Sequence, residues 1–540
     1  MSADWFVADG ASNPGQDAPA PPADTTGTGK RFAPQEPAAT GRPFGSTVGW
    51  TIFGAIIPGV GLLRAKHKVA GGIVLGVFVL LICALVYGVA FDRNRLIASA
   101  LQSSFLMYLA IGLLVLGLAW VVVITVSHLA LRAPHPPTGR RVVGAVVVGV
   151  LCMAVMAPMA MGANLAYTSS NLLSSVFGSA DKHSATVPTI NTNANPVDPW
   201  ASKPVLNIAL LGGDSGTGRP LDVGARTDSV AVLSINTETG YTTIISLPRQ
   251  TARMPFPPDS PLYKYYPNGF YDGHDATDAN YFLNAMYRMV PLQVPKDVLG
   301  TTSSLGADAV KISIGYALGI KIDYYVMINM DGFQQLINAI GGVTVNVNYK
   351  VPIGGVTSQN IQPNGWINPG PNEHLNGYLA MWYARGRFGL DDYSRMERQR
   401  CVINALAQQA SPQLVLTRYE SIATASEQMI ATDIPQSILP ALVTLATRVK
   451  GTTMGSVVFQ TGKNGFVAAN PNFDLMRTQV AAAIQATATM NQSKGSASAS
   501  PSASASASPT ASPSTKAAAT NVTDACAYNP QPYNSSTANG

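Results

Sequence analysis

Three long apolar runs near the start of the chain constrain its fold more strongly than any other feature of the sequence. They cover residues 69–91, 105–131 and 142–167. Each is long enough to cross a hydrocarbon core as a helix, which takes about 20 apolar residues. We therefore predict a transmembrane region over 46–168 that contains three spans.

A fourth apolar run, 50–63, is shorter and is interrupted by Pro58, Gly59 and Gly61. Runs of this length more often lie in the membrane interface or re-enter the membrane than cross it. We expect an interfacial or re-entrant segment here, and four spans remain the alternative on the sequence alone.

The basic residues predict the orientation, because lysine and arginine collect in short cytoplasmic loops. Two clusters lie before the first span and between the second and third: Arg64, Lys66 and Lys68, then Arg132, Arg140 and Arg141. Arg93 and Arg95 oppose this arrangement in the loop between the first two spans. With both clusters inside, three spans predict a multi-pass plasma-membrane protein whose domain after residue 169 is extracellular. Four spans would leave that domain in the cytoplasm.

Composition divides the rest of the chain. Residues 1–45 are rich in Pro, Ala and Gly and are expected to form a disordered cytoplasmic tail. Residues 169–204 have the composition of a linker, and 491–540 form a Ser/Ala/Pro-rich low-complexity tail. The stretch between them, 205–490, is long enough for a sizeable core. The formal net charge of +6 is spread over the whole chain, so we expect no nucleic-acid partner.

The globular stretch alternates between two hydrophobic patterns. Strand-like runs lie at 205–213, 229–236, 241–247, 324–330 and 343–347. Helix-like runs lie at 279–290, 330–340, 375–383 and 394–409. This alternation predicts an α/β domain with a central mixed sheet covered by helices.

Two acidic and two basic residues are predicted to meet at one edge of this sheet. The strands 229–236 and 241–247 should pair as a hairpin, which brings Arg226 and Asp228 beside Arg249. If 205–213 runs parallel to the second strand, Asp214 reaches the same edge. Two carboxylates beside two arginines suit a cation such as Mg²⁺ that shares phosphate oxygens. The alternative is a set of surface ion pairs and turn caps.

A second arginine cluster lies in the sequence "MWYARGRFGLDDYSRMERQR", which begins at Met381. Gly386 and Gly389 should end the helix 375–383, which leaves Arg385 and Arg387 on a loop. Asp391 or Asp392 should cap the next helix, on which Arg395 and Gln399 share a face. Arginine forks beside a helix N-terminus favour phosphate. Arg398 and Arg400 are expected on a solvated face.

Several motifs resemble the LytR-CpsA-Psr family, and the resemblance covers about 205–490. They are "RTDSVAVLSIN", "TIISLPRQ", "DYYVMINMDGFQQLINAIGGVTVNV", "HLNGYLAMWYARGR" and "DDYSRMERQR", with a later "FVAANPNFDLMRTQV" that fits actinobacterial members. Membrane-anchored members of this family transfer glycopolymers in Gram-positive envelopes. The resemblance implies a long apolar pocket for a polyprenyl chain, Mg²⁺ or Mn²⁺ on the pyrophosphate, and peptidoglycan as the acceptor.

The resemblance also implies roles for individual residues. The family's metal-binding aspartates fall on Asp214 and Asp228. Its phosphate-binding residues fall on Arg226, Arg249, Arg385, Arg387 and Arg395, with Gln399 beside them. Its acidic residue before the last arginine falls on Asp392. We expect Arg249, Arg385, Arg387, Asp392 and Arg395 to be the catalytic residues. The sequence departs from the family at Gln250, where an acid is usual, and near Lys264 and Asn268, where a lysine–asparagine motif is irregular.

The expected function is that of a phosphotransferase. A hydroxyl of peptidoglycan, commonly the muramic acid 6-hydroxyl, would attack a polyprenyl-pyrophosphate-linked glycan. The polyprenyl chain would anchor this glycan in the membrane lipid. One alternative is a polyprenyl-pyrophosphate phosphatase that uses water as the acceptor. Another is a non-catalytic protein that binds a lipid-linked glycan or regulates its use. The sequence does not specify the glycopolymer or the length of the lipid.

Four cysteines are present, and Cys83 and Cys152 lie in predicted spans. Cys401 and Cys526 are the only two expected on the oxidising exterior, where disulfides persist. A Cys401–Cys526 bridge is therefore one expectation. A buried Cys401 thiol with Cys526 free, or paired with another molecule, is the other.

Overall fold

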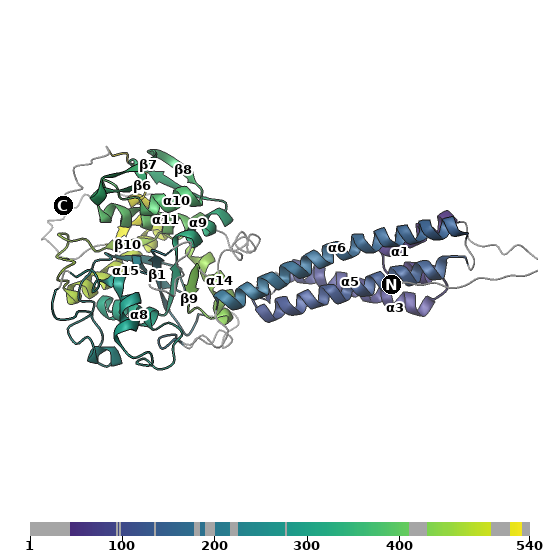
Figure 1. Cartoon of the computed structure of the whole chain (residues 1–540), viewed down its shortest axis with the longest axis horizontal. Helices are drawn as coiled ribbons and strands as arrows, with labels where there is room; N and C mark the ends of the chain where they lie inside the picture. The colour runs from purple at the N-terminus through teal and green to yellow at the C-terminus, as the bar shows by residue number, and fades with distance from the viewer. Residues whose placement is uncertain are drawn as a thin grey trace, which may run out of the picture.

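The computed structural model describes residues 44–92, 96, 99–133, 137–177, 184–188, 200–215, 225–275, 278–409, 429–497 and 519–531. They form a bundle of helices that projects from a globular α/β domain (Figure 1). All but the last two residues of the predicted tail 1–45 lie outside the described residues, as do Arg93 and Arg95.

Three helices of the bundle are long and apolar enough to cross a membrane. They are α3 (Lys68–Phe91), α5 (Ser103–Leu131) and α6 (Thr138–Val176). Their apolar side chains point outward, with Leu80 70% and Val150 62% exposed. Such a surface is suited to lipid rather than to water. Their bounds include the three apolar runs at 69–91, 105–131 and 142–167.

The short apolar run forms a helical hairpin at the end of the bundle far from the domain. Its helices are α1 (Phe44–Ile56) and α2 (Val60–Arg64). Three hydrogen bonds join α1 to α5 in antiparallel order: Thr47 Oγ1 to Leu131 O (3.4 Å), Thr51 Oγ1 to His128 Nδ1 (3.0 Å) and Trp120 Nε1 to Ala55 O (3.0 Å). The chain reverses at Gly59, whose φ of +97° favours glycine. α1 and α2 thus form a compact helical hairpin, whose first helix packs along α5.

A seven-stranded mixed sheet forms the centre of the domain. Its order is β11-β10-β3-β2-β1-β4-β9. The strands are β1 (Val205–Gly213), β2 (Thr227–Asn236), β3 (Thr242–Leu247), β4 (Tyr324–Ile328), β9 (Ile430–Thr432), β10 (Gly455–Val458) and β11 (Thr520–Asn521). β2 is antiparallel to both β1 and β3. β1 therefore runs in the same direction as β3, so Asp214 does reach the edge of the sheet where β3 ends.

Helices cover both faces of this sheet. One face packs against α7 (Leu283–Gln293), α8 (Leu305–Leu318) and α15 (Phe473–Ala497). The other packs against α14 (Leu439–Val449) and Trp200. β1 contributes to both cores because its side chains alternate between the two faces.

A third hydrophobic core lies outside the central sheet. It lies between α9 (Met330–Ala339), α10 (Gly377–Arg385), α11 (Asp392–Gln409) and two small sheets. The small sheets pair β5 (Val343–Val347) with β8 (Gly370–Leu375), and β6 (Val351–Val356) with β7 (Ile361–Ile367). Figure 1 shows these elements gathered on one side of the central sheet. The remaining short helices are η1 (Pro261–Lys264), η2 (Thr357–Gln359), η3 (Gln436–Ile438) and α16 (Val522–Ala525).

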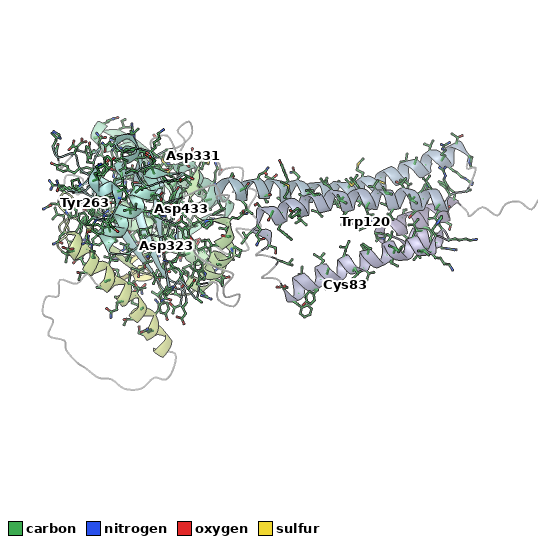
Figure 2. The ribbon with its side chains drawn as sticks, turned by 90° about the horizontal axis from the view of Figure 1, so that it is seen from below. Cys83, Trp120, Tyr263, Asp323, Asp331 and Asp433 are labelled. Carbon is green, nitrogen blue, oxygen red and sulfur yellow. A yellow bond between two sulfur atoms is a disulfide. The ribbon has the colours of Figure 1, made fainter. Side chains whose placement is uncertain are left out.

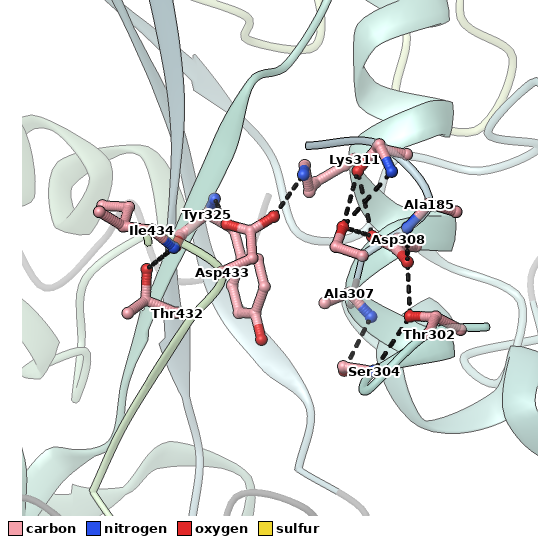
Figure 3. A network of polar contacts seen from close by, with 12 residues as sticks. Ala185, Thr302, Ser304, Ala307, Asp308, Lys311, Tyr325, Thr432, Asp433 and Ile434 are labelled. Carbon is pink, nitrogen blue, oxygen red and sulfur yellow. Dashed lines mark hydrogen bonds and ion pairs between the residues drawn. The ribbon is translucent and has the colours of Figure 1, made fainter. Parts of the chain in front are cut away.

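Polar contacts attach the bundle and the linker to the domain. Gln436 bonds Ser103 Oγ (3.0 Å) and Leu101 O (3.2 Å) at the start of α5. In the predicted linker 169–204, Ala185 N donates to buried Asp308 (3.0 Å), which also accepts from Thr302 (Figure 3).

The domain was predicted to begin at residue 205. Its described contacts begin earlier in the chain, before that residue. It also extends past 490, because α15 continues to Ala497 and residues 519–531 return to the domain.

Candidate functional site

Asp228 and Arg249 meet at the edge of the central sheet. Val230 of β2 lies opposite Leu247 of β3, so the residues just before and after them are neighbours. Arg249 donates from NH1 to Asp228 Oδ1 at 2.9 Å. Asn284, on α7, donates to the same oxygen at 3.1 Å.

Three arginine side chains form ion pairs with Asp392, the first residue of α11. They come from three different parts of the chain. Arg395 NH2 lies 3.0 Å from Asp392 Oδ1, Arg387 NH1 lies 3.5 Å from it and Arg249 Nε lies 3.6 Å from it. Arg395 NH2 also donates to the backbone oxygen of Asp228 at 2.9 Å. We call Asp228, Arg249, Arg387, Asp392 and Arg395 the arginine cluster.

The members of the arginine cluster differ in exposure. The side chain of Arg395 is 5% exposed, that of Arg249 is 21% exposed and that of Arg387 is 45% exposed. Arg395 is thus fixed within the protein, whereas Arg387 can reach a molecule in solvent.

Burial and neighbouring charges shift the pKa values of three members of the cluster. Burial raises the pKa of Asp228, but the charge of Arg249 and the hydrogen bonds from Asn284 and Arg249 outweigh it, so its pKa is lowered. Burial lowers the pKa of Arg395 to about 10, although Asp392 opposes the shift. The pKa of Arg387 is also lowered, first by burial and then by Arg249. At neutral pH, Asp228 is ionised and Arg395 is protonated.

Arg385 and Gln399 flank the cluster. Arg385 is the last residue of α10, not a loop residue as predicted, and it contacts Met330 Sδ. Gln399 Nε2 donates to Ser229 Oγ (2.7 Å) and Ala384 O (3.1 Å). Gln399 therefore connects the start of β2 to the end of α10, with Arg395 one turn before it on α11.

Asp214 and Arg226 face each other across the ends of β1 and β2. Asp214 Oδ1 accepts from Arg226 N at 2.8 Å, and the Arg226 side chain donates to Asn280 Oδ1 at 3.0 Å. The backbone of Met330 donates to Ser215 O at 3.4 Å. Because Met330 also contacts Arg385, this carboxylate lies along the same edge as the second arginine motif.

The residues around Asp214 and Asp228 fit a hard divalent cation that keeps part of its water shell. In the hydrogen bonds described above, each carboxylate uses only its Oδ1. The hydroxyls of Ser215 and Thr227, next to these aspartates in sequence, are buried and make no hydrogen bond to any residue that the structure describes. Among the described residues, no group of three or more His, Cys, Asp or Glu side chains converges. A metal here would therefore depend on water and substrate oxygens.

The LytR_cpsA_psr family model matches residues 167–489, more than half of the chain. This chain belongs to the LytR_cpsA_psr family. The resemblance found in the sequence is thereby confirmed. The match includes the whole arginine cluster, together with Asp214, Arg226, Arg385 and Gln399.

Curated relatives and solved structures are similar to parts of the chain. "Polyisoprenyl-teichoic acid–peptidoglycan teichoic acid transferase TagU" of Enterococcus faecalis is 25% identical over 300 residues, 54% of this chain and 78% of that protein. "Biofilm regulatory protein A" of Streptococcus mutans is 29% identical over 46% of this chain and 54% of that protein. The crystal structure of Bacillus subtilis TagV is 22% identical, covers 53% of this chain and 97% of that one, and has a TM-score of 0.35.

Asn284 was not among the predicted site residues. Lys264 and Asn268 were considered as the lysine–asparagine pair, but both lie in the exposed segment around η1. Asn284 instead lies beside Asp228, and its buried Oδ1 accepts no hydrogen bond from the described part of the chain. The signal available in the sequence was an asparagine within the helix-like run 279–290.

The prediction of a solvated face for Arg398 and Arg400 was wrong. Their exposures are 3% and 7%. Arg398 donates to Tyr383 O (2.5 Å), to Gly386 O and to the Tyr349 hydroxyl (2.7 Å). It therefore satisfies backbone carbonyls at the end of α10, which fixes the loop that carries Arg387.

Cys401 and Cys526 form a disulfide, with their Cα atoms 5.6 Å apart. Cys401 lies on α11, one residue after Arg400, and Cys526 follows α16. Asn346 Nδ2 donates to Cys526 O at 2.9 Å and Asn348 Nδ2 donates to Ala527 O at 3.1 Å. The C-terminal segment is thus attached beside the helix that carries Arg395.

Proposed function

We propose that this protein is a membrane-anchored phosphotransferase that moves a glycopolymer from a polyprenyl-pyrophosphate carrier to a hydroxyl of peptidoglycan. Membership of the family and the printed names of its relatives support glycopolymer transfer to peptidoglycan. The pyrophosphate carrier and the phosphoryl step are inferred from the chemistry of the site.

The observation that carries the proposal is the convergence of Arg249, Arg387 and Arg395 on Asp392. In these contacts three guanidinium groups share the carboxylates of Asp228 and Asp392, and Arg385 lies near them at the end of α10. The excess of positive charge favours a multiply charged anion. Guanidinium forks bind phosphate oxygens in pairs and remain charged, so a pyrophosphate is the ligand that this arrangement fits best.

Positioning and charge neutralisation are the main contributions that a protein makes to phosphoryl transfer. In the proposed step, the acceptor hydroxyl oxygen forms a bond to the sugar-side phosphorus. The bond from that phosphorus to the bridging oxygen breaks, and the lipid monophosphate leaves. Arg387 and Arg385, which are exposed, contact the phosphates, while buried Arg395 holds Asp392 and the start of β2 in place.

The proton of the attacking hydroxyl passes to a carboxylate of the site. The resemblance makes Asp392 one of the expected catalytic residues, but three guanidinium groups surround that carboxylate. The side chain of Asp228 is 33% exposed and that of Asp392 is 14% exposed. We therefore assign to Asp392 the orientation of the arginines and regard Asp228 as the more accessible acceptor.

Asp214 and Asp228 would hold the divalent cation, with Ser215 and Thr227 near them. Bound Mg²⁺ or Mn²⁺ would neutralise charge on the phosphate oxygens. Excess chelator should therefore abolish turnover, and added Mg²⁺ should restore it. Full activity in chelator would exclude a metal from the reaction.

The three apolar helices support a membrane anchor, with the domain on the extracellular side as the basic clusters predict. There the domain has access both to lipid carriers in the membrane and to the cell wall.

Turnover in ¹⁸O-labelled water separates transfer from hydrolysis. The full-length protein in detergent is supplied with a polyprenyl-pyrophosphate-linked glycan and a soluble peptidoglycan fragment. Transfer yields a glycan joined to the fragment through phosphate that lacks ¹⁸O. A phosphatase would release phosphate that carries ¹⁸O, and a non-catalytic binding protein would leave the donor unchanged.

A further inference from the structure

One face of α10 carries two aromatic rings that lead to the arginine cluster. Tyr378, Trp382 and Arg385 are separated by four and three residues, so they lie on the same side of the helix. The Tyr378 and Trp382 ring centroids are 6.4 Å apart, and the Arg385 guanidinium carbon lies 5.6 Å from the centroid of Trp382. We call Tyr378 and Trp382 the aromatic strip.

The neighbouring helix α9 lines the same surface with polar groups. Met330, at the start of α9, contacts Arg385, and Asn338, near its end, bonds Gly377 N at 2.7 Å. The two helices are therefore antiparallel. They are also close, since a Cβ at Gly377 would lie 2.0 Å from Gln334 O. Gln334, whose backbone oxygen lies beside Gly377, is partly exposed.

Core packing does not account for the whole strip. The buried face of α10 is made of Gly377, Ala380, Met381 and Tyr383. Trp382 covers the edge of the third core, but Tyr378 is 48% exposed. The Tyr378 ring is therefore accessible to a ligand, one helical turn from a ring that contacts a site arginine.

We propose that the aromatic strip binds the first sugar rings of the donor glycan, those joined directly to the pyrophosphate. This inference rests on the proposed function and adds a subsite to it. A pyranose presents a face of C–H groups that packs on the electron-rich face of an aromatic ring, and its hydroxyls bond nearby polar groups. With the phosphates held by Arg385, the first sugar lies at Trp382 and the next at Tyr378.

The donor is favoured over the acceptor because the strip is continuous with Arg385. The first sugar is covalently bonded to the phosphate, so it must lie within about one sugar-ring length of the Arg385 guanidinium. The spacings from Arg385 to Trp382 and from Trp382 to Tyr378 are on that scale. An acceptor is joined to nothing at the cluster before the reaction, so it has no such constraint.

Binding by the full-length protein in detergent tests the proposal without relying on transfer. The probes are a short polyprenyl pyrophosphate that carries a disaccharide and the same polyprenyl pyrophosphate without sugar. Tyr378→Ala should weaken binding of the sugar-bearing probe by about fivefold or more and leave the bare probe unchanged. Tyr378→Phe, which keeps the ring, should bind both probes as the wild type does.

Tyr263→Ala is the matched control. Tyr263 is 37% exposed and lies at the end of the domain far from the bundle, whereas Asp331 of α9 lies on the side nearer the bundle (Figure 2). Tyr263→Ala should change the affinity for neither the sugar-bearing probe nor the bare probe. Trp382→Phe should give a smaller, sugar-dependent loss than Tyr378→Ala gives, if the variant retains the wild-type melting temperature.

Equal weakening of both probes by Tyr378→Ala would show an indirect effect on the phosphate site and overturn the proposal. Unchanged affinity for both probes would also overturn it. If only the KM of a soluble peptidoglycan fragment rose, the strip would bind the acceptor and the donor assignment would be wrong. Sugar-dependent binding without any transfer would support the strip while contradicting the proposed function.

Discussion

Arg395 and Arg387 contact the same carboxylate but are expected to contribute differently. Arg395 is nearly buried and joins Asp392 to the backbone of β2, whereas Arg387 is exposed and available to substrate. We predict that Arg387→Lys and Arg395→Lys each lower turnover by about tenfold or more, because an ammonium group cannot replace a guanidinium fork.

The two variants should differ in stability. Arg395→Lys should also lower the melting temperature, since it breaks buried contacts, whereas Arg387→Lys should not. Arg288→Lys, at an exposed position on α7, is the control and should leave both quantities unchanged. Near-normal kcat/KM in both cluster variants would mean that these arginines form a surface network without a catalytic role.

Asp228 gives a pH-dependent contribution to stability. Its pKa is lowered in the folded protein, so its ionised form stabilises the fold above the unfolded pKa of about 3.9. That contribution is lost as the pH falls through the lower folded pKa. Wild type should therefore exceed Asp228→Asn in melting temperature by a constant margin from pH 7 to pH 5, and the margin should shrink below about pH 4.

The margin is measured by intrinsic fluorescence on the full-length protein in detergent. Asp259→Asn, at an exposed position near η1, should show no such trend. A margin that grew on acidification would require a raised pKa for Asp228 and would contradict the described contacts.

At the scale of elements, local patterns predicted the long central strands and the helices that carry the site. β1, β2 and β3 have continuous or alternating apolar residues, and the turn before Gly240 fixes the hairpin. The short edge strands β9 and β11 have three and two residues. Such strands depend on tertiary pairing and carry almost no periodic signal.

The local sequence pattern also did not predict which arginines of α11 are buried. Arg395, Arg398 and Arg400 are all buried, together with Met396 and Val402, whereas Glu397 between them is exposed. Arginines of the arginine cluster can be told from arginines that stabilise the fold only when it is known which backbone carbonyls lack a hydrogen bond within their own helix. For Arg398 these are Tyr383 O and Gly386 O, which belong to another element.

The disulfide belongs to this scale because it joins α11 to the C-terminal segment. It spans 125 residues of sequence, and chain entropy credits a loop of this length with about 4–5 kcal/mol. We predict that Cys401→Ser lowers the melting temperature and that Cys526→Ser lowers it equally. The double variant should be no less stable than either single one.

Non-reducing peptide mapping should recover Cys401 and Cys526 in one linked fragment. Recovery of both peptides alkylated before reduction would contradict the bridge. Cys83 and Cys152, which lie in α3 and α6, should be alkylated only after the protein is denatured in detergent.

For the whole molecule, the direction of α6 decides the orientation. α6 leads from the far end of the bundle into the domain, so Arg140 and Arg141 lie at the end opposite the domain (Figure 1). We predict that an impermeant maleimide labels Asn268→Cys in intact cells, and labels Lys66→Cys only after permeabilisation. The background carries Cys83→Ser and Cys152→Ser. The reverse labelling pattern would place the domain in the cytoplasm, away from any wall acceptor.

Transfer of labelled glycan to isolated cell-wall sacculi tests the central claim most directly. The full-length protein, Mg²⁺ and a radiolabelled polyprenyl-pyrophosphate glycan are incubated with sacculi, which are then boiled in detergent and counted. We predict that label remains covalently bound with the wild type and falls to background with Arg387→Lys or in excess chelator. Label that is always released as soluble glycan, or that binds equally with Arg387→Lys, would contradict the account.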